Sequence, residues 1–135
     1  MREILFRAKT KDTKWWVEGY YAIESNHACF ANELKHTHFI FKDEFMDWGI
    51  GGLVQYEVIP ETVGQYTGLT DKNGKKIFEG DIVKIHLMDY AEVGFIQYSA
   101  DSCRFKFFDM CSIGYGFDNT DVMEVIGNIH DDPEL

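Results

Sequence analysis

Short apolar runs separated by turn residues fill residues 65–130, and this pattern restricts the region to folds built from short strands. The strongest local signal is Asn73-Gly74 between two such runs, because a type I′ hairpin turn needs positive φ at both central residues. Glu79-Gly80-Asp81 predicts a second turn. Four or five short strands in about sixty residues, with a turn every ten or so, predict a small SH3-like barrel. Strands are expected at 82–86, 93–98, 104–108 and 123–130, and the stretches 65–69 and 77–78 lie on either side of the Asn73-Gly74 turn.

The N-terminal part carries weaker strand signals. Residues 3–9 alternate imperfectly between apolar and polar side chains, and the polar segment 10–14 and the aromatic-rich run 15–23 follow, which predicts a β-hairpin with 15–23 as its return strand. Shorter strands are expected at 38–41 and 56–59.

Pro60 ends the preceding strand because proline cannot donate a hydrogen bond to a strand ladder. We place the boundary between two regions of the chain just beyond this residue. The prediction is a mostly β fold, with α+β as the alternative. Residues 1–64 would form a β-rich region with room for one short helix, at 26–36 or 43–48. Residues 65–135 would form the SH3-like barrel.

The chain is acidic, and its charged residues are distributed unevenly along the sequence. The net charge is −10, and residues 86–135 carry only Arg104 and Lys106 against ten acidic side chains. Affinity for duplex DNA depends on Lys and Arg displacing counterions from phosphates, so duplex DNA is not expected as a partner. The main expected effect of the acidic surface is solubility.

Three stretches resemble the YopX family of phage and prophage proteins. The most specific is the long run from Gln65 to Val83, Gln-Tyr-Thr-Gly-Leu-Thr-Asp-Lys-Asn-Gly-Lys-Lys-Ile-Phe-Glu-Gly-Asp-Ile-Val. Residues 2–8 resemble the opening of that family and residues 123–131 its closing strand. The resemblance implies a phage or prophage accessory protein that self-associates, and it supplies no catalytic residue to transfer.

Motifs for cofactors or metals fail when examined residue by residue. A calcium loop of EF-hand type starting at Asp71 would need ligands or Gly where Lys75, Lys76 and Ile82 stand. The glycines at 49–52 lack the last Gly and the βαβ context of a dinucleotide fingerprint.

Cys29, His36 and His38 are the nearest approach to a metal cluster. His36 and His38 would share one face of a strand, but the set lacks a fourth ligand. We therefore predict no metal, no cofactor and no catalytic residue. An enzyme whose residues meet only in space is kept as the second alternative.

The N-terminal hairpin carries the candidate binding residues. Basic side chains beside aromatic ones are typical of surfaces for single-stranded nucleic acid, which makes nucleic-acid binding the first alternative. These basic residues are Arg2, Arg7, Lys9, Lys11 and Lys14. Lysines on an edge hairpin that discourage strand pairing are the plainer interpretation.

The aromatic pairs of the hairpin favour a protein partner. Trp15 and Trp16 are adjacent, as are Tyr20 and Tyr21, so one member of each pair must point away from the local core. An exposed Trp and Tyr on one face are typical of an interface. We therefore expect a non-enzymatic protein that acts by protein–protein interaction or self-assembly.

The cellular location follows from the cysteines and the start of the chain. The three cysteines, Cys29, Cys103 and Cys111, are an odd and sparse set, which fits reduced thiols better than a disulfide framework. The sequence shows no signal peptide and no apolar run of transmembrane length. We expect a cytoplasmic homo-oligomer with a host or phage protein as a further partner and no membrane contact.

Overall fold

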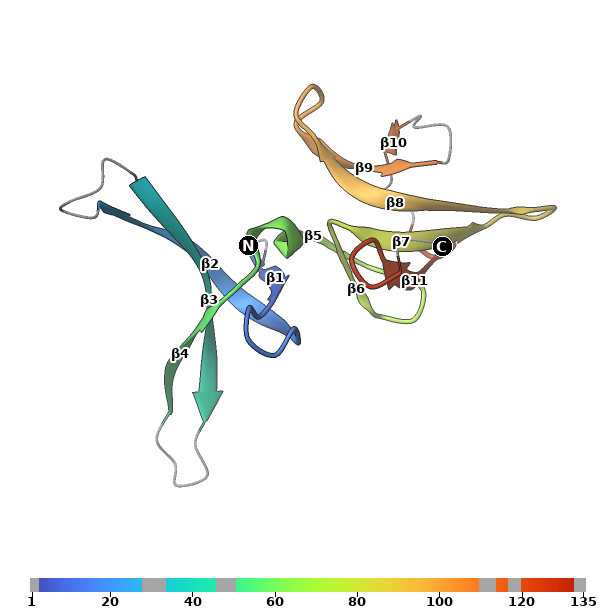
Figure 1. Cartoon of the computed structure of the whole chain (residues 1–135). Helices are drawn as coiled ribbons and strands as arrows, with labels where there is room; N and C mark the ends of the chain where they lie inside the picture. Colours follow the sequence, from blue (N-terminus) through green and yellow to red (C-terminus); the bar gives the residue numbers. More distant parts are fainter. Residues whose placement is uncertain (1–2, 28–33, 46–50, 110–113, 117–119, 133–135) are drawn as a thin grey trace. The chain divides into compact units, whose positions relative to one another are not determined.

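The structure is a computed structural model that describes residues 3–27, 34–45, 51–109, 114–116 and 120–132. Two compact units divide the chain: Ile4–Gln65, and a C-terminal unit that begins at Tyr66 and includes Glu3. The strands are β1 (Phe6–Lys9), β2 (Trp16–His27), β3 (Leu34–Phe45), β4 (Gly51–Glu57), β5 (Gly64–Thr70), β6 (Lys76–Phe78), β7 (Asp81–His86), β8 (Ala91–Ser99), β9 (Arg104–Phe108), β10 (Gly114–Gly116) and β11 (Met123–Asn128) (Figure 1). The mostly β prediction is confirmed.

The N-terminal unit is an antiparallel sheet in the order β4-β3-β2-β1, with the start of β5 beside β1. β1 and β2 form the predicted hairpin around residues 10–15, with Lys9 opposite Trp16. β3 lies between β2 and β4 and pairs with both of them in antiparallel orientation (Figure 1).

One face of this sheet holds its core. Ala8, Ile40 and Val58 are fully buried there, and alternate residues of the neighbouring strands pack against them. Tyr21, Ile40 and Tyr56 lie opposite one another across three strands. The residues between them along each strand must therefore point to the other face.

The expected short helix is wrong wherever the structure describes its two segments. Residues 26–27 and 34–36 are strand because β2 and β3 pair as far as His27 and Leu34, and residues 43–45 are strand because β3 pairs there with β4. The rest of those segments lies outside the described residues. Within the described ranges, helix occurs only as a single 3-10 turn, η1 (Pro60–Thr62), in the connection expected after Pro60.

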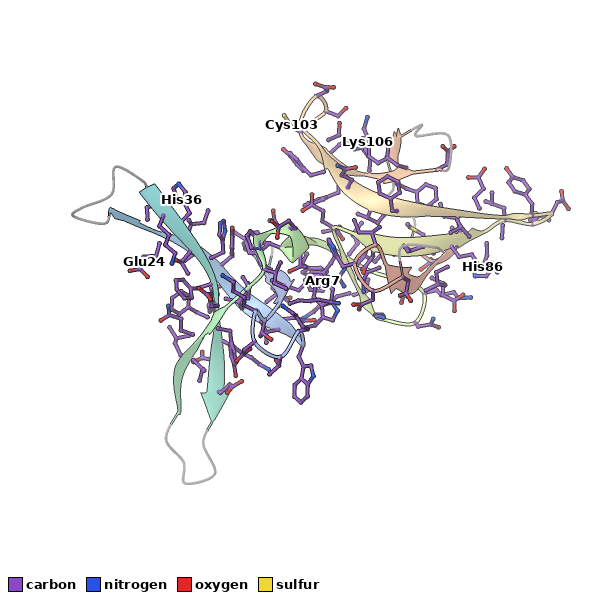
Figure 2. All side chains as sticks on the ribbon, viewed as in Figure 1. Arg7, Glu24, His36, His86, Cys103 and Lys106 are labelled. Atoms are coloured by element: carbon purple, nitrogen blue, oxygen red, sulfur yellow. The ribbon has the colours of Figure 1, made fainter. Side chains whose placement is uncertain are left out.

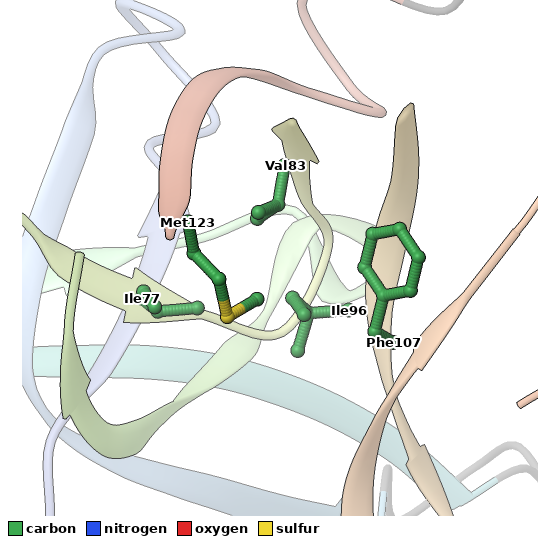
Figure 3. Packing of buried hydrophobic residues seen from close by; sticks show 5 residues of the cluster. All are labelled: Ile77, Val83, Ile96, Phe107 and Met123. Carbon is green, nitrogen blue, oxygen red and sulfur yellow. The ribbon is translucent and has the colours of Figure 1, made fainter. Parts of the chain in front are cut away.

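The C-terminal unit contains a five-stranded antiparallel sheet in the order β10-β9-β8-β7-β11 and the β5–β6 hairpin. Its core gathers side chains from β6, β7, β8, β9 and β11, as Figure 3 shows: Ile77, Val83, Ile96, Phe107 and Met123. The strands predicted for this region are present, and β10, which has only three residues, was not predicted.

The SH3-like barrel itself is not confirmed, because the two sheets are not closed. In the described part of this unit, no strand ladder joins β6 to β11. The edge of β11 that does not pair with β7 is hydrogen-bonded instead to the turn after β5. The N–H of Lys72 donates to the carbonyl of Met123 at 3.0 Å, and the N–H of Val125 donates to the Asp71 carboxylate at 3.0 Å.

The hairpin turn at Asn73-Gly74 differs in type from the one predicted. Gly74 has φ +81°, as expected, but Asn73 is not among the residues with positive φ. The N–H of Gly74 donates to the carbonyl of Asp71, and the N–H of Asp71 donates to the carbonyl of Lys75. This is a three-residue loop in which Gly74 follows a type I turn, and it needs positive φ only once.

Replacing Gly74 by Val should destabilise the fold by about 1–3 kcal/mol, because a β-branched residue at positive φ is strained. A Cβ at position 74 would meet no atom within 4 Å, so the backbone conformation alone carries the cost. Gly52→Val is the matched control, since that site in β4 is equally open but has no positive φ. Thermal melts should show a loss of several degrees for Gly74→Val only. Equal melting temperatures for the two variants would contradict the assigned turn.

Candidate functional site: the outer face of the N-terminal sheet

Apolar side chains gather on the face of the N-terminal sheet that points away from its core. We call this the outer face and define it by Trp16, Tyr20, Phe39, Phe41 and Leu53. Tyr20 lies opposite Phe41, and the rings of Phe39 and Phe41 are 6.3 Å apart. Tyr20 and Leu53 are each 61% exposed.

Trp16 joins this face through two basic residues of β1. The Arg7 guanidinium lies 4.8 Å and the Lys9 ammonium 5.6 Å from the centre of the Trp16 ring. Cations over an aromatic ring are attracted by its quadrupole and hold it in place. Trp16 is therefore half-buried although it does not belong to the core cluster of the unit.

The other members of the two aromatic pairs lie elsewhere. Trp15 precedes β2 and is 75% exposed. Tyr21 packs into the core against Phe6, at 5.4 Å between ring centres, and its hydroxyl is hydrogen-bonded to Nδ1 of His38. Burial raises the pKa of Tyr21. Of the four predicted interface residues, Trp16 and Tyr20 thus share one surface.

The basic residues of the hairpin do not line up as one groove. Arg7 and Lys9 stack on Trp16, whereas Lys11 forms an ion pair with Glu57 at 3.8 Å. The Lys14 ammonium donates to the carbonyl of Lys11 at 3.0 Å. Arg2 lies outside the described residues. Figure 2 labels Arg7 among the side chains of β1.

Three outer-face residues were missed from the sequence: Phe39, Phe41 and Leu53. Phe39-Ile40-Phe41 is a continuous apolar run, and only the register with β2 shows that Ile40 takes the core and the two Phe residues the opposite face. Leu53 follows the glycines at 49–52, which gave no strand signal, and Gly51 and Gly52 belong to β4.

The residues weighed for chemistry are separate from this face. Oγ of Ser25 and Nδ1 of His36 are hydrogen-bonded at 2.8 Å between β2 and β3, a Ser–His contact the sequence did not predict. Both side chains are exposed, and His36, labelled in Figure 2, is hydrogen-bonded to no described carboxylate. Nothing there completes a catalytic triad. Cys29 lies outside the described residues, and no group of three potential metal ligands occurs among those described.

A second histidine contact lies in the C-terminal unit. Nε2 of His86 and Oε2 of Glu124 are 2.9 Å apart across β7 and β11, and Lys72 lies 3.8 Å from the same carboxylate. The hydrogen bond with His86 lowers the pKa of Glu124 and outweighs the opposing effect of burial. These groups are only partly covered, and they are explained as cross-strand pairing.

The signature residues of the C-terminal unit hold structure together. Oδ1 of Asp71 accepts the N–H groups of Asn73 and Lys75, and Oδ2 accepts that of Val125. Burial acts to raise the pKa of Asp71, but these three hydrogen bonds outweigh it and the pKa is lowered. Asp81 is buried and accepts the N–H of Phe78 at 2.7 Å.

These features define a mostly β protein with two antiparallel sheets, a structural signature and an aromatic outer face. The sequence matches the family described as YopX protein over residues 5–135, and the chain belongs to the YopX family. No protein with a curated description matches it. The crystal structure of protein EF1440 from Enterococcus faecalis is similar, with a TM-score of 0.53 and 23% identity over 99% of this chain and 98% of that one. That likeness shows the fold. Among the described residues, no helix is long and apolar enough to cross a membrane.

Replacing Asp71 by Asn should lower the free energy of unfolding by about 1–3 kcal/mol at pH 7, because three backbone donors lose a charged acceptor. The pKa of Asp71 is lower in the folded chain than its ordinary value of 3.8. Its stabilisation is therefore complete above that value and is lost as the pH falls through the folded pKa.

Urea unfolding at pH 7 and at a series of values below about 4 should show the difference between the two proteins shrinking towards acid pH. Asp101→Asn, which removes the same charge from an exposed turn, is the control and should change little. A difference that stays constant with pH would mean that the charge of Asp71 is not what stabilises the turn.

Proposed function

We propose that this YopX-family chain acts by binding proteins and not by catalysis, and that its first partner is a further copy of itself through the outer face. The observation that carries the proposal is that Trp16, Tyr20, Phe39, Phe41 and Leu53 share the sheet face opposite the core. Aromatic residues and Arg dominate the binding energy of interfaces, and Arg7 lies on the Trp16 ring. The resemblance to phage and prophage proteins supports an accessory role there, in the cytoplasm.

Self-association must overcome the charge of the chain. Copies with a net charge of −10 repel one another at long range. The outer face itself mixes signs, since Lys9 and Arg7 lie beside Trp16 and Glu18 lies opposite Arg7. Short-range apolar contact can therefore form there without a local excess of negative charge, and added salt should favour it by screening the rest.

Light scattering should find the native chain oligomeric at micromolar concentration, and Tyr20→Ser should shift it towards the monomer. Tyr20 is the cleanest probe because it is 61% exposed and lies outside the core cluster. Trp16→Ser should act in the same direction. Trp15→Ser is the matched control: Trp15 is even more exposed but stands before β2, off the outer face.

Two results would end this proposal: a native monomer over the micromolar range, or an oligomer that Tyr20→Ser and Trp16→Ser both leave intact. Circular dichroism of each variant separates loss of assembly from loss of folding.

The positions of the lysines make nucleic-acid binding a weaker candidate function. Lys11 is paired with Glu57, and Lys14 is bonded to its own loop, so neither is presented with Arg7 and Lys9 as one phosphate track. A fluorescence titration at physiological salt should show no submicromolar affinity for duplex DNA. Tight binding that weakens steeply with salt would contradict this expectation.

A further inference from the structure

The free edge of β4 is open to a further strand over most of its length. β4 pairs with β3 on one side, and no other described residue range pairs with Gly51–Gln55 on the other. At its end, the N–H of Lys11 donates to the carbonyl of Glu57 at 2.9 Å. Since alternate residues of a strand bond to the same side, the N–H and C=O groups of Gly51, Leu53 and Gln55 also point to this edge.

This edge lacks the devices by which proteins protect exposed strands. Natural edges carry Lys, Pro, bulges or a covering segment. The sequence from Gly51 to Tyr56 is Gly-Gly-Leu-Val-Gln-Tyr, with no charge and no Pro, and its pairing with β3 shows no bulge. Only the end at Glu57 is covered, by the backbone of Lys11.

A depression lies where the covered part of the edge meets the open part. Its volume is about 200 Å³, and it is lined by Lys11, Asp12, Gln55, Tyr56 and Glu57. Ligand pockets of enzymes usually enclose about 300–1,000 Å³, so this one fits a single side chain and not a substrate.

The charge around the depression selects for a basic group. Asp12 and Glu57 line it, and Lys11 offsets one of these carboxylates. The Tyr56 hydroxyl donates to Glu44 at 2.7 Å, and the pKa of Tyr56 is raised first by that hydrogen bond, then by burial and by the charges of Glu44 and Asp12. Lys42 lies 3.9 Å from Glu44 and Lys11 lies 3.8 Å from Glu57, so Asp12 is the carboxylate of this group that no described basic side chain pairs with.

We propose that the β4 edge binds an extended, basic segment of a partner protein, which adds as an antiparallel strand beside Gly51–Gln55 and places a Lys or Arg in the Asp12/Glu57 depression. Strand addition draws affinity from main-chain hydrogen bonds and specificity from side-chain pockets. The open edge spans five residues, about 17 Å at ~3.4 Å per residue, which one short extended segment covers. Residues 9–11 already run antiparallel to 57–59, so the added segment continues their line with its N-terminal residue at the depression.

A second copy of the chain fits this edge less well than a basic segment. Two β4 strands paired with each other would bring together two copies of the same acidic surroundings, in chains of net charge −10. The edge binds through the main-chain groups of β4, whereas the outer face consists of side chains and shares only Leu53 with the edge, so the proposal stands whether or not that face mediates self-association.

The test uses the full chain and a labelled peptide, acetyl-Arg-Thr-Val-Thr-Val-Thr-amide, with the Arg→Glu peptide as its partner. Fluorescence anisotropy should detect binding of the Arg peptide and at least tenfold weaker binding of the Glu peptide. Amide hydrogen exchange at Leu53 and Gln55 should slow when the Arg peptide is bound, since these N–H groups gain acceptors.

Variants of the edge separate main-chain from side-chain effects. Leu53→Pro removes an outward N–H without touching the β3 ladder and should abolish binding. Leu53→Ser keeps that N–H and should retain binding within about threefold. Asp12→Asn with Glu57→Gln should weaken the Arg peptide by about three- to tenfold. Glu18→Gln removes one charge on β2, away from the depression, and should not weaken binding of the Arg peptide.

Three results would overturn the proposal. These are absence of Arg-peptide binding at millimolar concentration, binding that survives Leu53→Pro in a folded variant, and equal binding of the Arg and Glu peptides. Exchange protection at Leu53 and Gln55 that rises with protein concentration in the absence of peptide would also overturn it, by assigning the edge to a second copy. Light scattering on Tyr20→Ser reports separately on the outer face.

Discussion

The hydrogen bonds that the Asp71 carboxylate accepts join two distant parts of the C-terminal unit, and we expect the stability of the unit to depend on them. The two carboxylate oxygens close the turn after β5 and fix the edge of β11, which lies more than fifty residues further along the chain. A buried carboxylate is tolerable only because backbone donors saturate it, and the lowered pKa of Asp71 reports that saturation. Loss of the carboxylate would leave the N–H of Val125 on β11 without its acceptor.

The next turn of the chain uses the same principle. Gly80, at φ +91°, donates to the carbonyl of Ile96 and accepts from the N–H of Ile129. Asp81 accepts from Phe78 within the turn. Aspartates and glycines that look like ligand loops in the sequence are thus used to satisfy backbone groups between β6, β8 and β11. The most recognisable part of the sequence is therefore structural, and the candidate binding surfaces lie in the N-terminal unit.

The local sequence pattern was enough to predict most strands. It failed for segments whose strand conformation depends on pairing with distant strands. Alternation predicted the β1–β2 hairpin, and turn residues placed β5 to β9 and β11. Residues 34–36 and 43–45 lack a clear period, and they are strand because β2 on one side and β4 on the other supply hydrogen bonds along β3. The positive φ of Gly74 was predictable from residue type, but the loop length was not, because it depends on the bond between Asp71 and Lys75.

The candidate surfaces were predictable only in part, for a geometrical reason. Adjacent aromatic residues require one ring to leave the core, and this alone predicts an exposed Trp and Tyr. Which ring leaves depends on the register of β1 with β2, where Ala8 opposite Val17 fixes the core face and so sends Trp16 and Tyr20 outward.

The edge of β4 depends on still longer-range information. Its exposure follows from the order of four strands and from the single bond by which Lys11 covers Glu57. A strand without charge or Pro at that position is costly for a protein that must avoid aggregation. The N-terminal sheet carries such an edge and an apolar face together, and the proposed binding of proteins would account for both features.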